Sequence, residues 1–204
     1  MLTLLFSSPL VFLLALAGLL VSISLHEAAH CFVTDALGDP TPRVRGRLTL
    51  NPKAHLDPLG TVLLVLTGFG WGKPAPYDPY NLKSPVRDSA LIALAGPLTN
   101  LLLAVILSIL NRWFSGNLLN LLTQYLIMIN LSLALFNLLP VYPLDGGKIM
   151  RALLPKMASL EYEQLMERYG NAILLFMILP IFQGQSVVSQ ILDPLINLLA
   201  NWLL

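Results

Sequence analysis

Long runs without a charged side chain alternate with short charged segments along the chain. Four of these runs are long, at residues 1–25, 89–111, 113–144 and 169–192. A helix that spans a bilayer needs about 20 apolar residues, so each long run predicts a membrane-spanning helix. A fifth run, 58–72, is shorter and holds four glycines, which predicts a re-entrant or interfacial segment in place of a span.

The segments outside the four runs have patterns of their own. Residues 43–50 read Arg-Val-Arg-Gly-Arg-Leu-Thr-Leu and alternate roughly with period 2, which is typical of a strand or of one arm of a hairpin. Residues 71–79 contain three prolines, which remove N–H donors and disfavour a helix. Residues 186–204 are apolar except for Asp193, which predicts a short fifth span or an interfacial helix.

Composition excludes most other classes of protein. Only 11% of the 204 residues are charged and 56% are hydrophobic, whereas soluble domains carry about 25% charged residues. A net charge of +1 gives no basic face for nucleic acid, and a single cysteine cannot form an internal disulfide. We therefore predict an all-α polytopic membrane protein. It has four to five transmembrane helices and a small membrane-associated β hairpin or re-entrant element. The chain forms one domain, 1–204, with a catalytic core at about 9–155.

The distribution of lysine and arginine predicts the orientation of these spans. Seven of the twelve basic residues lie between the first and second spans, one between the second and third, and four between the third and fourth. Loops rich in Lys and Arg face the cytoplasm. The first and third connections are therefore expected in the cytoplasm and the N-terminus outside, in a multi-pass protein of the cell membrane.

The motif that carries chemistry lies near the end of the first span. The sequence His26-Glu27-Ala28-Ala29-His30 puts two imidazoles one helical turn apart on one face. Such a pair holds one metal ion, and Glu27 beside it can act on a metal-bound water, as in zinc-dependent proteases. A polar patch that bonds between helices and half of a di-iron site are the alternatives. The di-iron site requires a second Glu-x-x-His motif, which the chain lacks.

A catalytic zinc site takes three protein ligands and a water, so a third ligand is required. His55 is the only other histidine in the sequence. Asp145 is the only acidic residue within the long apolar stretch 113–160. Asp145 follows two prolines and precedes two glycines, which break the helix there. Irregular backbone at membrane depth occurs where it lines a cavity. The alternative to a ligand role for Asp145 is an ordinary loop aspartate at the cytoplasmic edge. The alternative for His55 is a structural or solvated loop histidine.

These motifs resemble the site-2 protease family of intramembrane zinc metalloproteases, in its compact prokaryotic form without a PDZ domain. The resemblance rests on His26-Glu27-Ala28-Ala29-His30, on Leu144-Asp145-Gly146-Gly147 and on Gly96-Pro97-Leu98-Thr99-Asn100. It extends to the segments 51–60 and 70–74. The matching motifs run in the family's order from residue 26 to residue 147.

The resemblance implies that Asp145 is the third ligand of one zinc ion per chain, beside His26 and His30. It also implies that Glu27 is the general base and acid, and that Asn100 acts near the site by positioning the substrate backbone or the oxyanion. An ordinary interhelical hydrogen bond is the alternative for Asn100. The family has a membrane-entering β element, for which 43–50 and 58–72 are the candidates.

The expected function is hydrolysis of peptide bonds within or near transmembrane segments of other proteins, as in regulated intramembrane proteolysis. The active site is expected toward the cytoplasmic side, with lipid and transmembrane substrates as partners and no nucleic acid. An edge strand near 43–50 would hold the unwound substrate by strand addition. The alternatives are a metal-binding transporter, whose site would lie at a discontinuous helix, and a catalytically inactive membrane adaptor.

Overall fold

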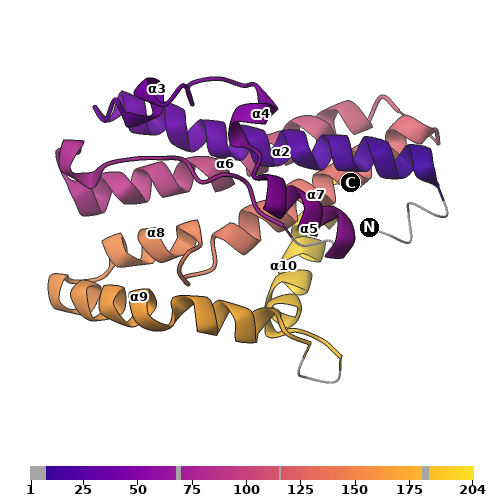
Figure 1. The fold of residues 1–204 in the computed structure, drawn as a ribbon. Coiled ribbons are helices and arrows are strands. Elements are labelled where there is room, and N and C mark those ends of the chain that lie inside the picture. Colours follow the sequence, from indigo (N-terminus) through magenta and orange to yellow (C-terminus); the bar gives the residue numbers. More distant parts are fainter. Residues whose placement is uncertain (1–7, 68–69, 115, 181–183) are drawn as a thin grey trace.

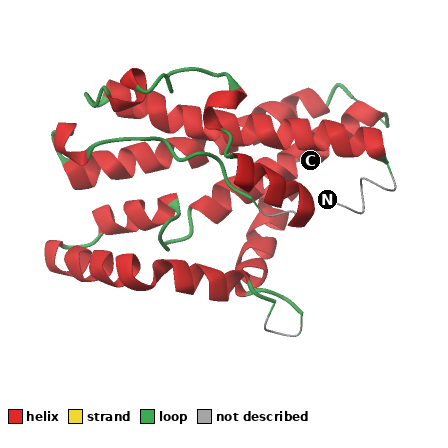
Figure 2. Cartoon of the chain, in the orientation of Figure 1, coloured by secondary structure: helices red, strands yellow, loops and turns green. Residues whose placement is uncertain are grey.

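The computed structural model describes residues 8–67, 70–114, 116–180 and 184–204. The described residues are mainly helical and contain no β-sheet (Figures 1 and 2). The elements are α2 (Pro9–Ala36), α3 (Thr41–Val44), α4 (Pro52–His55), α5 (Pro58–Thr67), η1 (Pro79–Asn81), α6 (Pro85–Asn111), α7 (Leu118–Asn137), α8 (Asp145–Leu153), α9 (Lys156–Ile178) and α10 (Val187–Leu203).

Three of these helices, α2, α6 and α7, are long and apolar enough to cross a membrane. Proline occupies the first turn of α2 and of α6, where its missing N–H costs nothing. The side chain of Asn117 accepts a hydrogen bond from the backbone N–H of Asn120 and caps the start of α7. The spans predicted at 89–111 and 113–144 are thus present as helices with shifted ends, and so is the span predicted at 1–25, of which residues 1–7 lie outside the described residues.

The fourth predicted span, 169–192, is wrong as a single helix. Helix α9 begins in a charged segment and ends at Ile178, and α10 begins only at Val187. Pro180 lacks the N–H that a helix interior uses, and Gly184 has a φ of +80° that belongs to a turn. The apolar run is therefore divided between two helices. Helix α10, over the 186–204 segment, has 17 residues.

The strand predicted at 43–50 is also wrong. Helix α3 (Thr41–Val44) occupies the start of this segment, and Gly46 turns the chain with a φ of +64°. Its arginines do not line one face of a strand. The guanidinium of Arg43 pairs with Asp35 at 2.6 Å, whereas Arg47 points inward and is only 5% exposed.

The segment 58–72 begins with a short helix and does not form a hairpin in its described residues. Helix α5 has ten residues, about 15 Å at the usual rise, which is too short to span. Its Leu64 packs with Leu19 and Ile23 of α2. A single antiparallel bridge joins Leu56 to Gly72, so the chain leaves α5 and returns beside the helix that carries the two predicted histidine ligands.

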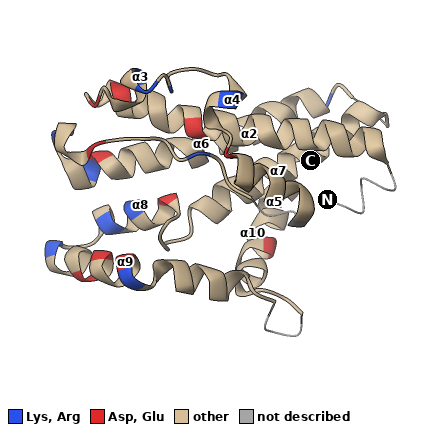
Figure 3. Cartoon of the chain, viewed as in Figure 1, with Lys and Arg blue, Asp and Glu red and all other residues tan. Residues whose placement is uncertain are grey.

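The helices enclose one main core between α6, α7 and α10, which contact one another. Helix α8 returns from the end of α7 and packs against α6, and α10 runs across the direction of the other long helices (Figure 1). Most Lys and Arg residues lie at the end of the molecule where α2 ends and α6 begins (Figure 3). This packing brings the start of α8 opposite the C-terminal half of α2.

Candidate metal centre

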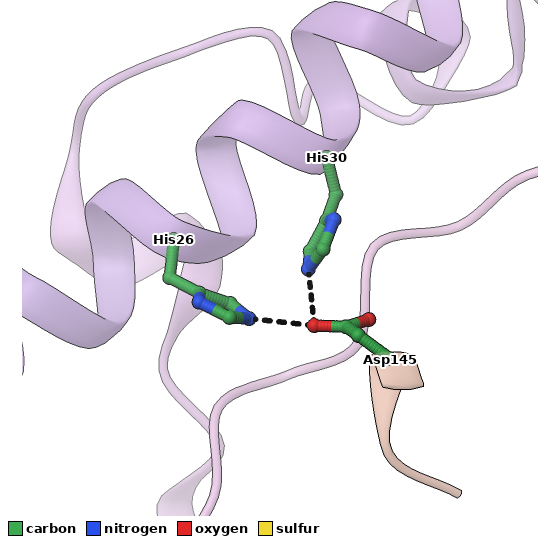
Figure 4. Close-up of side chains that lie close together, drawn as sticks. All are labelled: His26, His30 and Asp145. Atoms are coloured by element: carbon green, nitrogen blue, oxygen red, sulfur yellow. Dashed lines mark ion pairs between the residues drawn. The ribbon is translucent and has the colours of Figure 1, made fainter. Parts of the chain in front are cut away.

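Three side chains from distant parts of the chain meet between α2 and α8 (Figure 4). The Nε2 atoms of His26 and His30 lie 3.2 and 3.3 Å from the same oxygen, Oδ2 of Asp145. Single ligand atoms of the three residues all lie within 4.8 Å of one another, and all three side chains are buried. The geometry therefore brings together the predicted ligand set.

The backbone at Asp145 is shaped to deliver its side chain to this place. A Cβ on Gly146 would collide with the backbone of Leu138, and one on Gly147 would collide with Tyr142. The two glycines therefore permit the close return of the chain from α7 into α8. Asp145 is the first residue of α8, so this tight return points its carboxylate at α2.

A chain of hydrogen bonds fixes the proton on His26. The carbonyl of Gly18 only accepts, so the hydroxyl of Ser22 donates to it at 2.9 Å. Ser22 in turn accepts from the side-chain amide of Asn130 at 3.0 Å. The oxygen of Asn130 then accepts from the amide of Asn100 at 2.9 Å. The oxygen of Asn100 is left to accept from Nδ1 of His26, at 2.6 Å. Nε2 of His26 therefore presents a lone pair.

A single hydrogen bond fixes the position of the proton on His30. Its Nδ1 lies 2.6 Å from the carbonyl oxygen of Ile92, which can only accept, so Nδ1 carries the proton. A Cβ on Gly96 would lie 2.5 Å from Nε2 of both His26 and His30. Only a glycine at this position of α6 leaves room for the two imidazole faces and for a ligand between them.

This donor set fits a metal ion. Two imidazole lone pairs and one carboxylate oxygen converge, and Oδ2 of Asp145 has no hydrogen-bond partner in the described structure. Three acceptor atoms without a proton between them repel one another, and a buried charge needs a partner. Two histidines and one carboxylate are a zinc ligand set that leaves a fourth position open. A cation at this point satisfies all three atoms.

Glu27 lies beside the three converging side chains but is not one of them. Its Oε2 accepts a hydrogen bond from the backbone N–H of Ala75 at 3.0 Å. Glu27, His26 and His30 line a cavity of about 1070 Å³. The rest of the lining is mainly apolar and comes from α2, the segment after α5, and helices α5 to α10. The carboxylate therefore borders this cavity next to the converging atoms.

Asn100 lies next to the converging group, against the ring of His26. The side chain is fully buried and faces His26, with its amide also 3.5 Å from the carbonyl of Ser22. It is not among the residues that line the cavity. Its described contacts thus fit a residue that orients His26 better than one that touches substrate. Sequence reasoning missed Ser22 and Asn130, although polar residues inside apolar spans signal such contacts.

His55 is buried away from the converging group and has partners of its own. Its Nε2 donates to the carbonyl of Thr49 at 2.7 Å, and Arg47 donates to its Nδ1 at 3.5 Å. Burial, together with the charge of Arg47, lowers the pKa of His55 despite the hydrogen bond to Thr49. The ring is therefore a neutral structural group that ties the α3–α4 connection together.

Several apolar helices, an H-E-x-x-H motif within one of them and a remote aspartate beside it define a class of multi-pass membrane protein with a metallopeptidase-like site. The sequence profile of Peptidase family M50 matches residues 111–181. YwhC of Bacillus subtilis, whose name describes a zinc metalloprotease, is 39% identical over 88% of this chain and 84% of its own length. The chain belongs to Peptidase family M50, the site-2 protease family.

This chain matches a smaller share of two other relatives. Rip2 of Mycobacterium tuberculosis H37Rv, also named for a zinc metalloprotease, is 35% identical over 67% of this chain and 55% of Rip2. Zinc metalloprotease MJ0392 of Methanocaldococcus jannaschii is 29% identical over 79% of this chain and 40% of that protein. The solved site-2 protease from Methanocaldococcus jannaschii aligns with a TM-score of 0.48 and 24% identity, over 92% of this chain and 72% of that one.

Proposed function

We propose that this protein is an intramembrane zinc endopeptidase that hydrolyses peptide bonds within or near transmembrane segments of other proteins. One observation carries the proposal. Three unprotonated ligand atoms of His26, His30 and Asp145 converge next to Glu27, at one wall of a large and mainly apolar cavity. Membership of Peptidase family M50 supports the same reaction.

His26, His30 and Asp145 would hold one zinc ion per chain. Bound zinc lowers the pKa of a water molecule to about 7 and polarises the scissile carbonyl. Glu27 accepts the proton of the attacking water and later delivers it to the leaving amine nitrogen. Asn100 and the carbonyl of Ile92 hold the two imidazole rings in the tautomer that leaves Nε2 free.

The substrate we propose is a transmembrane helix that has been locally unwound. Amide groups in such a helix are bonded within the segment, so an intact turn cannot present its carbonyl to the site. The cavity is lined by apolar residues of α7 and α10, including Met128, Leu133 and Ile196, which suit side chains from a lipid-facing segment. Regulated intramembrane proteolysis is the process in which we expect it to act.

The orientation we propose follows the basic residues. Segments 43–87 and 148–168 carry eleven of the twelve Lys and Arg residues, and such segments stay in the cytoplasm. The site would then open toward the cytoplasmic half of the cell membrane. Single cysteines at Lys83 and Lys156, in a Cys31→Ala background, should be protected from an impermeant reagent in intact cells. A cysteine at Asn117 should react, and the reverse pattern would invert this orientation.

The alternatives of a metal transporter and an inactive adaptor are not favoured. A transporter gives no reason for a carboxylate such as Glu27 next to the two histidines, and an adaptor needs no converging ligand set. The relatives named above carry the names of zinc metalloproteases.

Glu27→Gln tests the proposed function directly. Purified protein is assayed for zinc content and for cleavage of a model transmembrane substrate in detergent and in liposomes. We expect zinc to be retained and cleavage to fall at least ~1000-fold, since the ligands remain while the proton acceptor is lost. Glu161→Gln, an exposed acid on α9, is the matched control and should cleave normally. Normal turnover by Glu27→Gln would refute the assignment.

A further inference from the structure

An extended segment, Gly72–Pro76, passes directly beside the acid of the candidate site. Its conformation is held by contacts to its own backbone. The N–H of Lys73 donates to the carbonyl of His55 at 2.7 Å. The guanidinium of Arg47 donates to the carbonyl of Lys73 at 2.7 Å and to that of Pro74 at 3.3 Å. These contacts fix the backbone of the segment where it passes Glu27.

Arg47, which holds these carbonyls, is a charged residue in a buried position. It is 5% exposed, and its described partners are carbonyl groups and the ring of His55, without a carboxylate in ion-pair contact. Burying a charged group is costly unless its partners are fixed. The bonds that Arg47 makes converge on Lys73 and Pro74, so the side chain fixes the position of the residues immediately before Ala75.

The sequence of the segment isolates a single donor. Pro74 and Pro76 have no N–H, and a residue before proline is restricted to extended conformations. Ala75 therefore contributes the one amide N–H of the stretch 74–76. That N–H donates to Oε2 of Glu27 at 3.0 Å. The two prolines and Arg47 thus hold one donor in a fixed place against one oxygen of the carboxylate.

We propose that Arg47 and the segment Gly72–Pro76 form a positioning element for Glu27. The inference rests on the proposed proteolytic function. A glutamate side chain on a helix surface has several rotamers, and small misplacements of a catalytic group cost large factors in rate. The Ala75 N–H holds Oε2 and restricts the carboxylate to one rotamer. The remaining lone pairs are available for proton transfer. Arg47 acts only through this segment.

Removal of a single hydrogen atom tests the proposal. Ala75→Pro replaces the N–H by a ring carbon, whereas Ala75→Gly removes the methyl group and keeps the N–H. We expect kcat for Ala75→Pro to be at least tenfold below that of Ala75→Gly, with KM within about twofold and zinc content unchanged. Equal kcat values for the two variants would overturn the proposal. A higher kcat for Ala75→Pro would overturn it as well, because the contact would then be inhibitory.

Hydrogen exchange tests the contact without any activity measurement. Fragments that isolate residues 74–76 hold one exchangeable amide, that of Ala75. We expect this amide to exchange at least tenfold faster in Glu27→Ala and in Arg47→Ala than in the wild type, and at the wild-type rate in Glu161→Gln. Unchanged protection in Glu27→Ala would refute the contact.

The two measurements separate failure of this inference from failure of the proposed function. A wild-type protein that cleaves no transmembrane substrate would refute the proteolytic function. A wild-type protein that cleaves, together with an Ala75→Pro variant that cleaves equally fast, would refute the positioning role alone. If Arg47→Ala does not fold, the comparison of Ala75→Pro with Ala75→Gly still decides.

Discussion

Asn100 accepts a hydrogen bond from Nδ1 of His26 at 2.6 Å, across 74 residues of sequence and between two different spans. The Asn100 amide is itself held by Asn130 of a third span. The tautomer of one proposed metal ligand therefore depends on the relative placement of α2, α6 and α7. A metal site built in this way is therefore sensitive to changes in how these three helices pack, even where the changes lie far from the ligands.

Asn100→Ala is expected to weaken zinc binding by roughly 10- to 100-fold, the usual cost of losing a group that orients a histidine ligand. Zinc affinity is measured by competition with a chelator of known strength. Thr99→Ala, at the neighbouring polar residue whose hydroxyl donates to the carbonyl of Ala95, is the control. Full zinc affinity with lost cleavage would instead support the substrate-positioning role that the motif suggested.

Asp145→Asn is expected to lower zinc affinity strongly and to abolish cleavage. The substitution keeps the size of the side chain but removes the negative charge that would neutralise the ion. His55→Ala should keep stoichiometric zinc, because both ring nitrogens of His55 are used in contacts with Thr49 and Arg47. Zinc per protein after dialysis distinguishes the two. Loss of metal from His55→Ala alone would overturn the ligand set.

Gly96→Ala is expected to abolish metal binding although the substitution favours a helix. The new Cβ would lie 2.5 Å from Nε2 of both histidines, and neither ring can retreat without losing its Nδ1 partner. Gly18→Ala on α2 is the matched control. There the new Cβ meets the end of the flexible Leu126 side chain, which can rotate away. Normal zinc binding by Gly96→Ala would show that the two rings are more mobile than their contacts indicate.

Acid is expected to destabilise the connection after α2, because it protonates the carboxylate of Asp39. Burial raises the pKa of Asp39, but hydrogen bonds from Thr41, from the backbone of Asp78 and from Asn81 outweigh it and hold the pKa below its ordinary value. A lowered carboxyl pKa stabilises the fold above the unfolded value of about 3.9, and this stability is lost as the pH falls below it.

Asp39→Ala should therefore cost about 2–3 kcal/mol of unfolding free energy at pH 7 and less at pH 3. Unfolding in detergent at the two pH values measures this difference. Asp35→Ala is the comparison. Asp35 pairs with Arg43, whose side chain is 69% exposed, so its loss should cost less than about 1 kcal/mol. Equal costs for the two variants would contradict the role given to Asp39.

The long apolar runs and the short motifs could be predicted from the sequence, because each depends on local physics. Three spans follow from length and hydropathy, and the one-turn spacing of His26 and His30 follows from helix geometry. The position of Asp145 beside them required the resemblance, since nothing local states which loop returns to the first span. Arg47 and Asn130 were missed because their roles depend on partners that are distant along the chain, such as Lys73 and Asn100.

The two wrong predictions have separate causes. Period-2 alternation at 43–50 reflected two unrelated arginine environments, a surface pair for Arg43 and a buried set of carbonyls for Arg47. The absence of charge over 169–192 does not show that these residues form one continuous helix. Pro180 and Gly184 divide that run into the end of α9 and the start of α10. Charge-free length therefore overestimates a span where a turn divides the run, as it does between α9 and α10.

The order of the ligands along the chain also sets when the site can exist. His26 and His30 leave the ribosome early, whereas Asp145 follows the last residue of α7 by eight positions. A nascent chain with one or two inserted helices thus has two imidazoles and no carboxylate partner. With the proposed ligand set, the complete site therefore forms only after α7 has been synthesised and inserted.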